Sequence, residues 1–395
     1  MGKAKKEFII YFPNWKTGTE NGNVSDIPWD KITMINHAFM KVVPGNGDRD
    51  TSFARREKGL SARETFEISS TNENADRMIF EEYRKYHEKY PDVKIMISIG
   101  GWCCCGYFSE MAYTEGGRKS FTEACVKLME QHEWISGIDI DWEYPGGAEW
   151  GERGAEGDYN EGCPIWSSSS EDAGNFTLLL KTMRESFDAR FGKGARLVTA
   201  CAGAAMSIIG HQNWGDASKY LDYINIMTYD MANEKDGVAG HGSNVEGCRA
   251  AVDYLIKDNV DKAKINIGAP YYGTGFDLVA IPDNHKIIGT PIKPVSSISR
   301  EALTYTFMHN IEKEAVDKDS KGWHYCYDEI AKGAYLYNDD EESDQYLWFI
   351  SYDSDQVLKD KVDYILNEDI AGIIIWEITQ DSSDHHMTEI LSQLI

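Results

Sequence analysis

The sequence lacks any apolar run long enough to cross a membrane. No stretch of about 18 apolar residues occurs, so we expect no membrane partner. The first apolar segment, Phe8–Phe12, is also too short for the hydrophobic region of a signal peptide, and we interpret it as a strand. This N-terminus fits a cytoplasmic protein, or a secreted one whose signal has been removed, so the localisation stays unknown.

Basic charge is scarce. The chain carries 40 Lys and Arg residues against 65 Asp and Glu, a formal net charge of −25. Such an excess repels phosphate backbones and anionic lipid surfaces, which argues against nucleic-acid and membrane partners. Hydrophobic residues make up 42% of the 395 positions, enough for a large core. We expect a monomeric soluble enzyme that acts on a neutral polymer.

The cysteines lack the spacing of a metal site or of a disulfide framework. There are eight in a long chain, and three of them are consecutive, Cys103 to Cys105. Consecutive cysteines point in alternate directions and do not form the CxxC pattern that zinc sites use. We therefore expect free thiols and no metal.

Alternating acidic and apolar residues in Gly137–Glu143 are the most informative feature present. On a strand, Asp139, Asp141 and Glu143 would line one face and large apolar side chains the other. Carboxylates two positions apart lie about 7 Å apart, so buried neighbours cannot all ionise at low cost. One should stay protonated near neutral pH, and a carboxylic acid ready to donate a proton is what glycosidic-bond cleavage requires.

Short apolar runs alternate with amphipathic stretches, a pattern typical of βαβ units. The helical stretches include Ala75–Lys89, Arg118–His132, Ala173–Arg190, Val245–Lys257 and Asp355–Asn367. The predicted strands are Phe8–Phe12, Thr33–Lys41, Lys94–Ile99, Gly137–Glu143, Arg196–Ala202, Tyr223–Tyr229, Lys264–Ala269 and Gly372–Trp376. Eight such strands predict an α/β fold, a TIM (β/α)8 barrel, with its active site at the carboxyl ends of the strands.

Two segments interrupt this pattern. A polar Gly/Ser-rich stretch, Gly146–Asp172, directly follows the acidic strand, and such loops on a barrel are often functional. From about residue 273 to residue 349, short mixed segments rich in aromatics predict a small α+β insertion domain. We therefore divide the chain into a catalytic barrel of residues 1–272 and 350–395 and an insertion of residues 273–349.

The acidic run resembles the D-G-x-D-x-D-x-E signature of glycoside hydrolase family 18, the chitinase family, with Ser136 in place of its first Asp. Ser98–Trp102 resembles the S-x-G-G block of that family, Met227–Asp230 its M-x-Y-D block and Gly372–Glu377 its last strand. The predicted insertion lies where the chitinase subfamily with deep clefts has one. Thr274 departs from the pattern, because the family commonly carries Arg there.

The resemblance implies roles for individual residues. Glu143 would protonate the leaving oxygen, Asp141 would orient the 2-acetamido group of the substrate, and Asp139 would tune Asp141. That acetamido group would attack the anomeric carbon and form an oxazolinium ion, while Tyr229 donates to its oxygen. No metal or organic cofactor is implied. The substrate-binding residues implied are Trp376, Met227, Asp230, Tyr11, Phe39, Trp102, Tyr144 and Met206.

The predicted function is thus an endo-acting chitinase that binds chitin or N-acetylglucosamine oligomers and cleaves their β-1,4 linkages with retention. An endo-β-N-acetylglucosaminidase and a spore-cortex or peptidoglycan hydrolase would share the acidic strand. The insertion favours chitin, and no cell-wall-binding repeats are visible. An inactive chitin-binding lectin is the alternative from another class, but such relatives generally lose the acid that Glu143 keeps.

Overall fold

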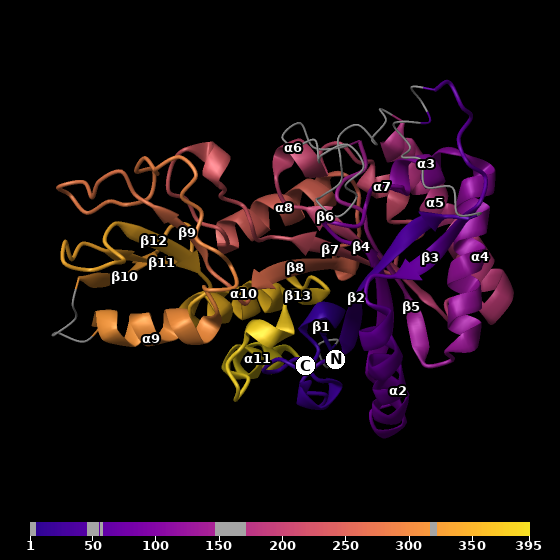
Figure 1. Cartoon of the computed structure of the whole chain (residues 1–395), viewed down its shortest axis with the longest axis horizontal. Helices are drawn as coiled ribbons and strands as arrows, with labels where there is room; N and C mark the ends of the chain where they lie inside the picture. The colour runs from indigo at the N-terminus through magenta and orange to yellow at the C-terminus, as the bar shows by residue number, and fades with distance from the viewer. Residues whose placement is uncertain (1–4, 46–54, 56–57, 147–170, 317–321) are drawn as a thin grey trace.

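The computed structural model of the chain describes residues 5–45, 55, 58–146, 171–316 and 322–395 (Figure 1). Most of the Gly/Ser-rich stretch that follows the acidic strand lies outside these residues, so its function stays a prediction.

A closed barrel of eight parallel strands forms the larger part of the fold, as the sequence predicts. Around the barrel the strands follow the order β1-β13-β8-β7-β6-β5-β4-β2, and pairing of β1 with β2 closes it. The strands are β1 (Glu7–Pro13), β2 (Met34–Pro44), β4 (Lys94–Gly100), β5 (Ile135–Asp141), β6 (Leu197–Gly203), β7 (Tyr223–Met227), β8 (Ile265–Pro270) and β13 (Gly372–Trp376). A short antiparallel strand that no prediction covered, β3 (Phe66–Ser70), extends the sheet beside β2.

The helices of the described residues begin and end close to the predicted bounds. Several start at a side chain that accepts a hydrogen bond from the first turn: Asn72 for α2, Thr114 for α4 and Asn244 for α8. The α-helices are α2 (Glu73–Lys89), α3 (Phe108–Tyr113), α4 (Glu115–Gln131), α5 (Asp172–Phe191), α6 (Met206–Ile209), α7 (Trp214–Ala217), α8 (Val245–Lys257), α9 (Tyr305–Val316), α10 (Asp355–Glu368) and α11 (His386–Leu391).

The barrel strands bury both faces, as parallel strands covered by helices do. In β5 and just beyond it, Ile138, Ile140 and Trp142 belong to the large core between strands and helices. The opposite face, which carries Asp139 and Asp141, points into the barrel. There the residues that pack together form the interior cluster: Ile9, Tyr11, Met34, Ala38, Phe39, Met96, Cys201, Met227, Tyr229, Tyr272 and Ile374.

Two predicted strands are shorter than expected at the end where the site lies. β5 ends at Asp141 rather than Glu143, because the backbone N–H of Glu143 donates to the Cys105 sulfur instead of to a neighbouring strand. β7 ends at Met227 rather than at residue 229. The Thr228 hydroxyl there donates to the Gly268 carbonyl and accepts from the Gly268 N–H, in place of a backbone ladder.

A second sheet lies between β8 and β13 in the sequence, as the sequence predicts. Its antiparallel strands follow the order β10-β11-β12-β9, and α9 packs on one face, beside the sheet in Figure 1. The strands are β9 (Thr274–Asp277), β10 (Trp323–Asp328), β11 (Gly333–Asn338) and β12 (Trp348–Tyr352). The boundaries proposed for the two units, at residues 272/273 and 349/350, stay a prediction.

The helices in the described ranges all fall short of the length and apolarity that a membrane span requires. No disulfide joins any two of the seven cysteines within those ranges. Among the same residues, no group of three or more His, Cys, Asp or Glu side chains could hold a metal ion.

A buried ion pair joins the insertion sheet to the barrel. Lys361 of α10 and Asp353, which directly follows β12, are both fully buried. The Lys361 ammonium also donates to the Ser243 hydroxyl and to the Gly268 carbonyl of β8. Three partners thus satisfy the three donors of one buried cation, and removal of that cation would leave Asp353 uncompensated.

We therefore predict that Lys361→Met lowers the free energy of unfolding by about 3–5 kcal/mol, the usual cost of breaking a buried pair on one side. Urea unfolding followed by circular dichroism measures the change. Lys119→Met removes an exposed pair with Glu115 and should cost about 1 kcal/mol or less. Equal effects of the two substitutions would contradict the structural role of the buried pair.

Candidate active site

Three acidic side chains lie at increasing depth in the barrel, starting from its open end at the carboxyl ends of the strands. Glu143 lies just beyond the carboxyl end of β5 and is half-buried, whereas Asp141 and Asp139 on the strand are buried. The alternation predicted from the sequence therefore places both Asp residues inside the barrel. In a parallel α/β barrel, this end is where active sites form.

Asp139, the deepest acid, is held by four hydroxyl and amide donors from four strands, and the Cys201 thiol also donates to it at 3.8 Å. Its carboxylate accepts hydrogen bonds from Tyr11 (3.0 Å), Ser98 (2.7 Å), Thr199 (2.5 Å) and Asn225 (3.3 Å). Burial raises the pKa of Asp139, and these hydrogen bonds oppose that rise. The hydrogen bonds fix this carboxyl group in the barrel and leave it no freedom to reach a ligand at the mouth.

Asp141 is the least well satisfied of the three acids. Burial, followed by the charges of Glu143 and Asp139, raises its pKa well above the ordinary value of Asp, and a hydrogen bond from Cys201 opposes this. Its Oδ1 atom is buried and has no hydrogen-bond partner. A buried acceptor without a partner is costly, so this atom is suited to accept a hydrogen bond from a ligand.

Glu143 combines an elevated pKa with a half-buried position at the open end of the barrel. Burial raises its pKa to about 7, and the charge of Asp230 adds to the rise. A hydrogen bond with Tyr144 and the positive charge of Arg300 act in the opposite direction. A carboxyl group with this pKa is divided between its acid and base forms near neutral pH, so it can both donate and accept a proton.

Two glycines allow other strands to approach the acidic strand closely. A side chain at Gly100, whose φ is +119°, would place its Cβ 2.0 Å from the Asp141 carbonyl oxygen. A Cβ at Gly101, with φ of +80°, would lie 2.4 Å from the ring of Phe39. Gly100 and Gly101 therefore permit this close approach, because any larger residue would displace the acidic strand or the Phe39 ring.

Two thiols contact the acids, and sequence reasoning did not find them. The buried Cys105 sulfur lies 3.2 Å from the Glu143 backbone N–H and 3.2 Å from the Asp141 carbonyl oxygen. Cys201 lies 2.9 Å from the Tyr11 hydroxyl inside the barrel. The first thiol positions the backbone that carries Glu143, and the second completes the polar lining around the two Asp residues.

Aromatic rings form a floor beside the acids. Trp376 at the end of β13 stacks on Phe39 with ring centroids 5.5 Å apart, and Tyr11 lies 5.6 Å from it at a tilt. Trp15, 48% exposed, extends this floor and stacks on Phe39 at 6.0 Å. No prediction covered Trp15, although its position just after the first strand places it at the end of the barrel where active sites form. Flat apolar faces of this kind suit the apolar faces of sugar rings.

The other predicted residues divide into two groups. Met227, Tyr229 and Tyr144 pack within or against the interior cluster. Trp102 and Met206 lie at the same end of the barrel, after β4 and β6, but are not part of that cluster. They are 41% and 48% exposed, so they lie at the open end of the barrel rather than in its interior.

Asp230 follows Tyr229 with a positive φ of 55°, which turns the chain sharply after β7. The Tyr272 hydroxyl donates to its carboxylate at 2.8 Å, and the Arg300 guanidinium contacts the same oxygen at 2.9 Å. Arg300 comes from the insertion, so the insertion contributes a charge to the site. No sequence pattern pointed to this residue.

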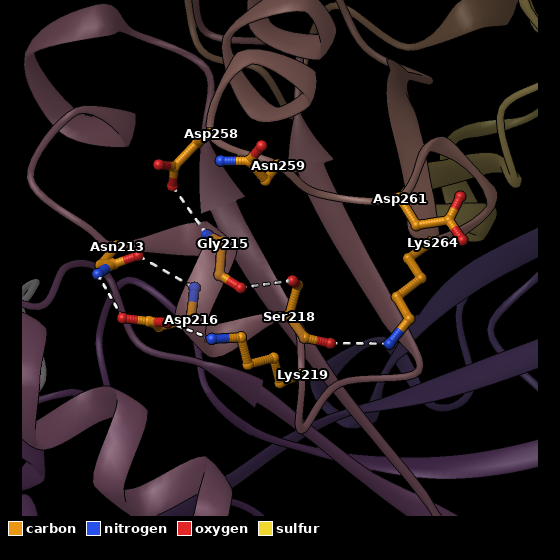
Figure 2. Close-up of a pocket in the computed structure, with 9 residues that line it drawn as sticks. All are labelled: Asn213, Gly215, Asp216, Ser218, Lys219, Asp258, Asn259, Asp261 and Lys264. Atoms are coloured by element: carbon orange, nitrogen blue, oxygen red, sulfur yellow. Dashed lines mark hydrogen bonds and ion pairs between the residues drawn. The ribbon is translucent and has the colours of Figure 1, made fainter.

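A recess elsewhere on the molecule is unrelated to these acids. Figure 2 shows it, with a cavity volume of about 460 Å³, where α7 meets the connection between α8 and β8. Its residues precede β7 and β8 and so lie at the amino ends of the strands, opposite the acids. They are Asn213, Gly215, Asp216, Ser218, Lys219, Asp258, Asn259, Asp261 and Lys264.

Known proteins resemble this chain over most of its length. Chitinase A1 of Niallia circulans is 27% identical over 418 residues, which cover 95% of this chain and 56% of that protein. Endochitinase 1 of Metarhizium robertsii is 26% identical over 390 residues, or 94% of this chain and 81% of that protein. The chain therefore spans little more than half the length of the first of these relatives.

The fold also matches a solved family 18 N-acetylglucosaminidase from Paenibacillus barengoltzii. The TM-score is 0.73 at 26% identity, over 99% of this chain and 100% of that one. The sequence pattern that defines the glycosyl hydrolases of family 18 matches residues 7–381, from the first strand of the barrel to the segment beyond the last. The match thus includes the acids and the insertion, and the chain belongs to glycosyl hydrolase family 18.

Proposed function

We propose that the protein is a chitinase that hydrolyses β-1,4 linkages between N-acetylglucosamine units with retention of configuration. The observation that carries the proposal is Glu143, a half-buried acid whose pKa is raised to about 7 at the open end of the barrel. A glycosidase needs such a group, because the leaving oxygen must gain a proton as its bond to carbon breaks.

In the first step, protonated Glu143 gives its proton to the glycosidic oxygen, and the leaving sugar departs as an alcohol. The carbonyl oxygen of the 2-acetamido group on the reacting sugar attacks the anomeric carbon, which gives a cyclic oxazolinium ion. In the second step, ionised Glu143 takes a proton from water, which attacks the same carbon and reopens the ring. Two inversions at one carbon give net retention.

Asp141 would orient and stabilise the acetamido group. Its buried Oδ1 has no partner within the protein, so it can accept a hydrogen bond from the acetamido N–H. An ionised Asp141 would also stabilise the positive charge that develops on the oxazolinium ring. Asp139, held by four hydroxyl and amide donors, would act on Asp141 through its charge and not on the sugar.

Tyr229 and the aromatic floor would complete the site. We assign to the Tyr229 hydroxyl a hydrogen bond to the acetamido oxygen, since this side chain is buried in the interior cluster next to the acids. Trp376 would lie under the reacting sugar, and Trp102 and Met206 would contact the sugar on the leaving side. A neutral chitin oligomer would suffer no charge repulsion from a chain with a net charge of −25.

A second candidate function is an N-acetylglucosaminidase that releases single sugars. The support is the Paenibacillus barengoltzii enzyme, which matches this chain in fold over its full length at 26% identity. Both activities would use the same acids and differ in which linkage is cut. Mass spectrometry of the first products from an N-acetylglucosamine hexamer separates them, because an endo-acting chitinase releases oligomers before single sugars accumulate.

We predict that Glu143→Gln removes nearly all turnover while the protein still binds N-acetylglucosamine oligomers. The amide keeps the shape of the acid but has no proton to give, and general acid catalysis contributes about a hundredfold or more. Turnover is measured on a chitin pentamer and binding by calorimetry. Glu115→Gln, on the exposed end of α4, is the matched control. A Glu143→Gln protein with more than about a tenth of the wild-type rate would contradict the assigned role.

We also predict that kcat/KM falls as the pH rises through about 7, because Glu143 must be protonated for the first step and its pKa is about 7. The raised pKa extends the acid form upward from the ordinary range of Glu, so activity persists at pH values where an exposed Glu would be ionised. A pH profile on an uncharged chitin oligomer measures this limb. Constant activity well above neutral pH would exclude Glu143 as the acid.

Finally, chitin oligomers should yield the β-anomer first, and oligomers without the N-acetyl group on the reacting sugar should be nearly inert. A thiazoline analogue of the oxazolinium ion should inhibit, since it resembles the intermediate. Proton NMR of the first products reads the anomer directly. Initial α-anomer, or equal rates on acetylated and deacetylated oligomers, would contradict catalysis by the substrate's own acetamido group.

A further inference from the structure

We propose that Arg300 is a substrate-positioning residue of this site, supplied by the insertion in place of the charge that Thr274 lacks. It would hold the Asp230 carboxylate and donate a hydrogen bond to the sugar bound next to Glu143. This inference rests on the proposed function and adds a specificity element to it.

The contacts of Arg300 with Asp230 and Tyr272 place its guanidinium group at the active site. One guanidinium nitrogen lies 2.9 Å from Asp230, and the guanidinium carbon lies 5.1 Å from the centre of the Tyr272 ring. Tyr272 in turn donates to the same Asp230 oxygen. The Arg300 side chain is 54% exposed, so its remaining N–H groups are open to a ligand. A guanidinium group that is held by a carboxylate through one nitrogen can donate its other N–H groups to sugar hydroxyl and carbonyl oxygens.

The loop that carries Arg300 is attached to the segments that follow β13 and β1, two neighbouring strands of the barrel. The Gln380 side chain, which follows β13, donates to the Arg300 carbonyl at 3.2 Å. The next residue, Glu301, forms an ion pair with Lys16, which follows Trp15 at the edge of the aromatic floor. These contacts hold Arg300 in place before a ligand arrives, which reduces the entropy lost on binding.

Position 274 cannot provide this charge itself. Thr274 is a short neutral side chain in β9 whose hydroxyl lies against Gly242, where a Cβ would come within 2.4 Å of it. Arg300, from the loop between β9 and α9, provides the positive charge instead.

Arg300 also affects the proton balance of the acid. Its positive charge lowers the pKa of Glu143, against burial and the charge of Asp230, which raise it. The other titratable side chains that face the site are carboxyl, phenol and thiol groups. They are Asp139 and Asp141 of β5, Tyr144 beyond it, Tyr229 and Asp230 after β7, Tyr272 after β8, Tyr11 of β1 and Cys201 of β6.

The test compares Arg300→Gln, Arg300→Lys and the control Arg249→Gln, an arginine of α8 paired with Glu246 and Glu368. We expect Arg300→Gln to lower kcat/KM on chitin oligomers by about tenfold or more, the usual loss for one charge-assisted hydrogen bond. The basic limb of its pH profile should move to higher pH, because the pKa of Glu143 rises when the cation is removed. Arg300→Lys keeps the positive charge, so the basic limb of its pH profile should stay near the wild-type position. It should lose part of the affinity for the chitin oligomer.

A double-mutant cycle with Asp230→Asn tests whether the effect of Arg300 on kcat/KM depends on its contact with Asp230 or on a general loss of protein stability. In that background Arg300→Gln should cost clearly less than in the wild type, since the contact is already broken. If Arg300→Gln matches Arg249→Gln in kcat/KM and in its pH limb, the proposal is wrong. The same holds if Arg300→Lys and Arg300→Gln shift the limb equally. A wild-type protein that turns over no N-acetylglucosamine oligomer would instead contradict the proposed function.

Discussion

Burial of carboxyl groups inside the barrel is the constraint on which the rest of this structure depends. An isolated buried carboxylate is costly, so each acid must gain hydrogen bonds, share a proton or lie near an opposite charge. The barrel uses all three means along one strand: four hydroxyl and amide donors around Asp139, a raised pKa at Asp141 and a nearby cation at Glu143. The most deeply buried acid, Asp139, is thus the most firmly held, and the least buried, Glu143, is the one best able to exchange a proton.

The surrounding elements serve this arrangement. The glycine pair at the end of β4 allows the acidic strand to lie close to its neighbour, and Cys105 contacts the backbone where the acidic strand ends. The aromatic floor lies beside the acids, and the insertion adds the Arg300 guanidinium next to Asp230. The insertion is therefore part of the site as well as a second sheet, and the buried pair of Lys361 with Asp353 fixes it to the barrel.

Features set by local patterns were predictable from the sequence, and features set by distant contacts were not. The eight barrel strands and the inward acids follow from alternation, which each segment carries by itself. The ends of β5 and β7 were predicted too far along, because they depend on Cys105 and Gly268, far away in the chain. Arg300 was missed for the same reason: no motif marks an arginine that reaches the site from a loop between β9 and α9. The strand β3 was missed because its sequence is short and half polar.

The most direct test of the account is the titration of the Glu143 carboxyl group itself, followed by carbon NMR of the protein labelled at Glu side chains. The Glu143→Gln spectrum assigns the signal. The account predicts a midpoint near pH 7, and a rise of that midpoint in Arg300→Gln. A midpoint in the ordinary range of an exposed Glu, about 4.3, would contradict the claim that burial among acids prepares this residue to donate a proton.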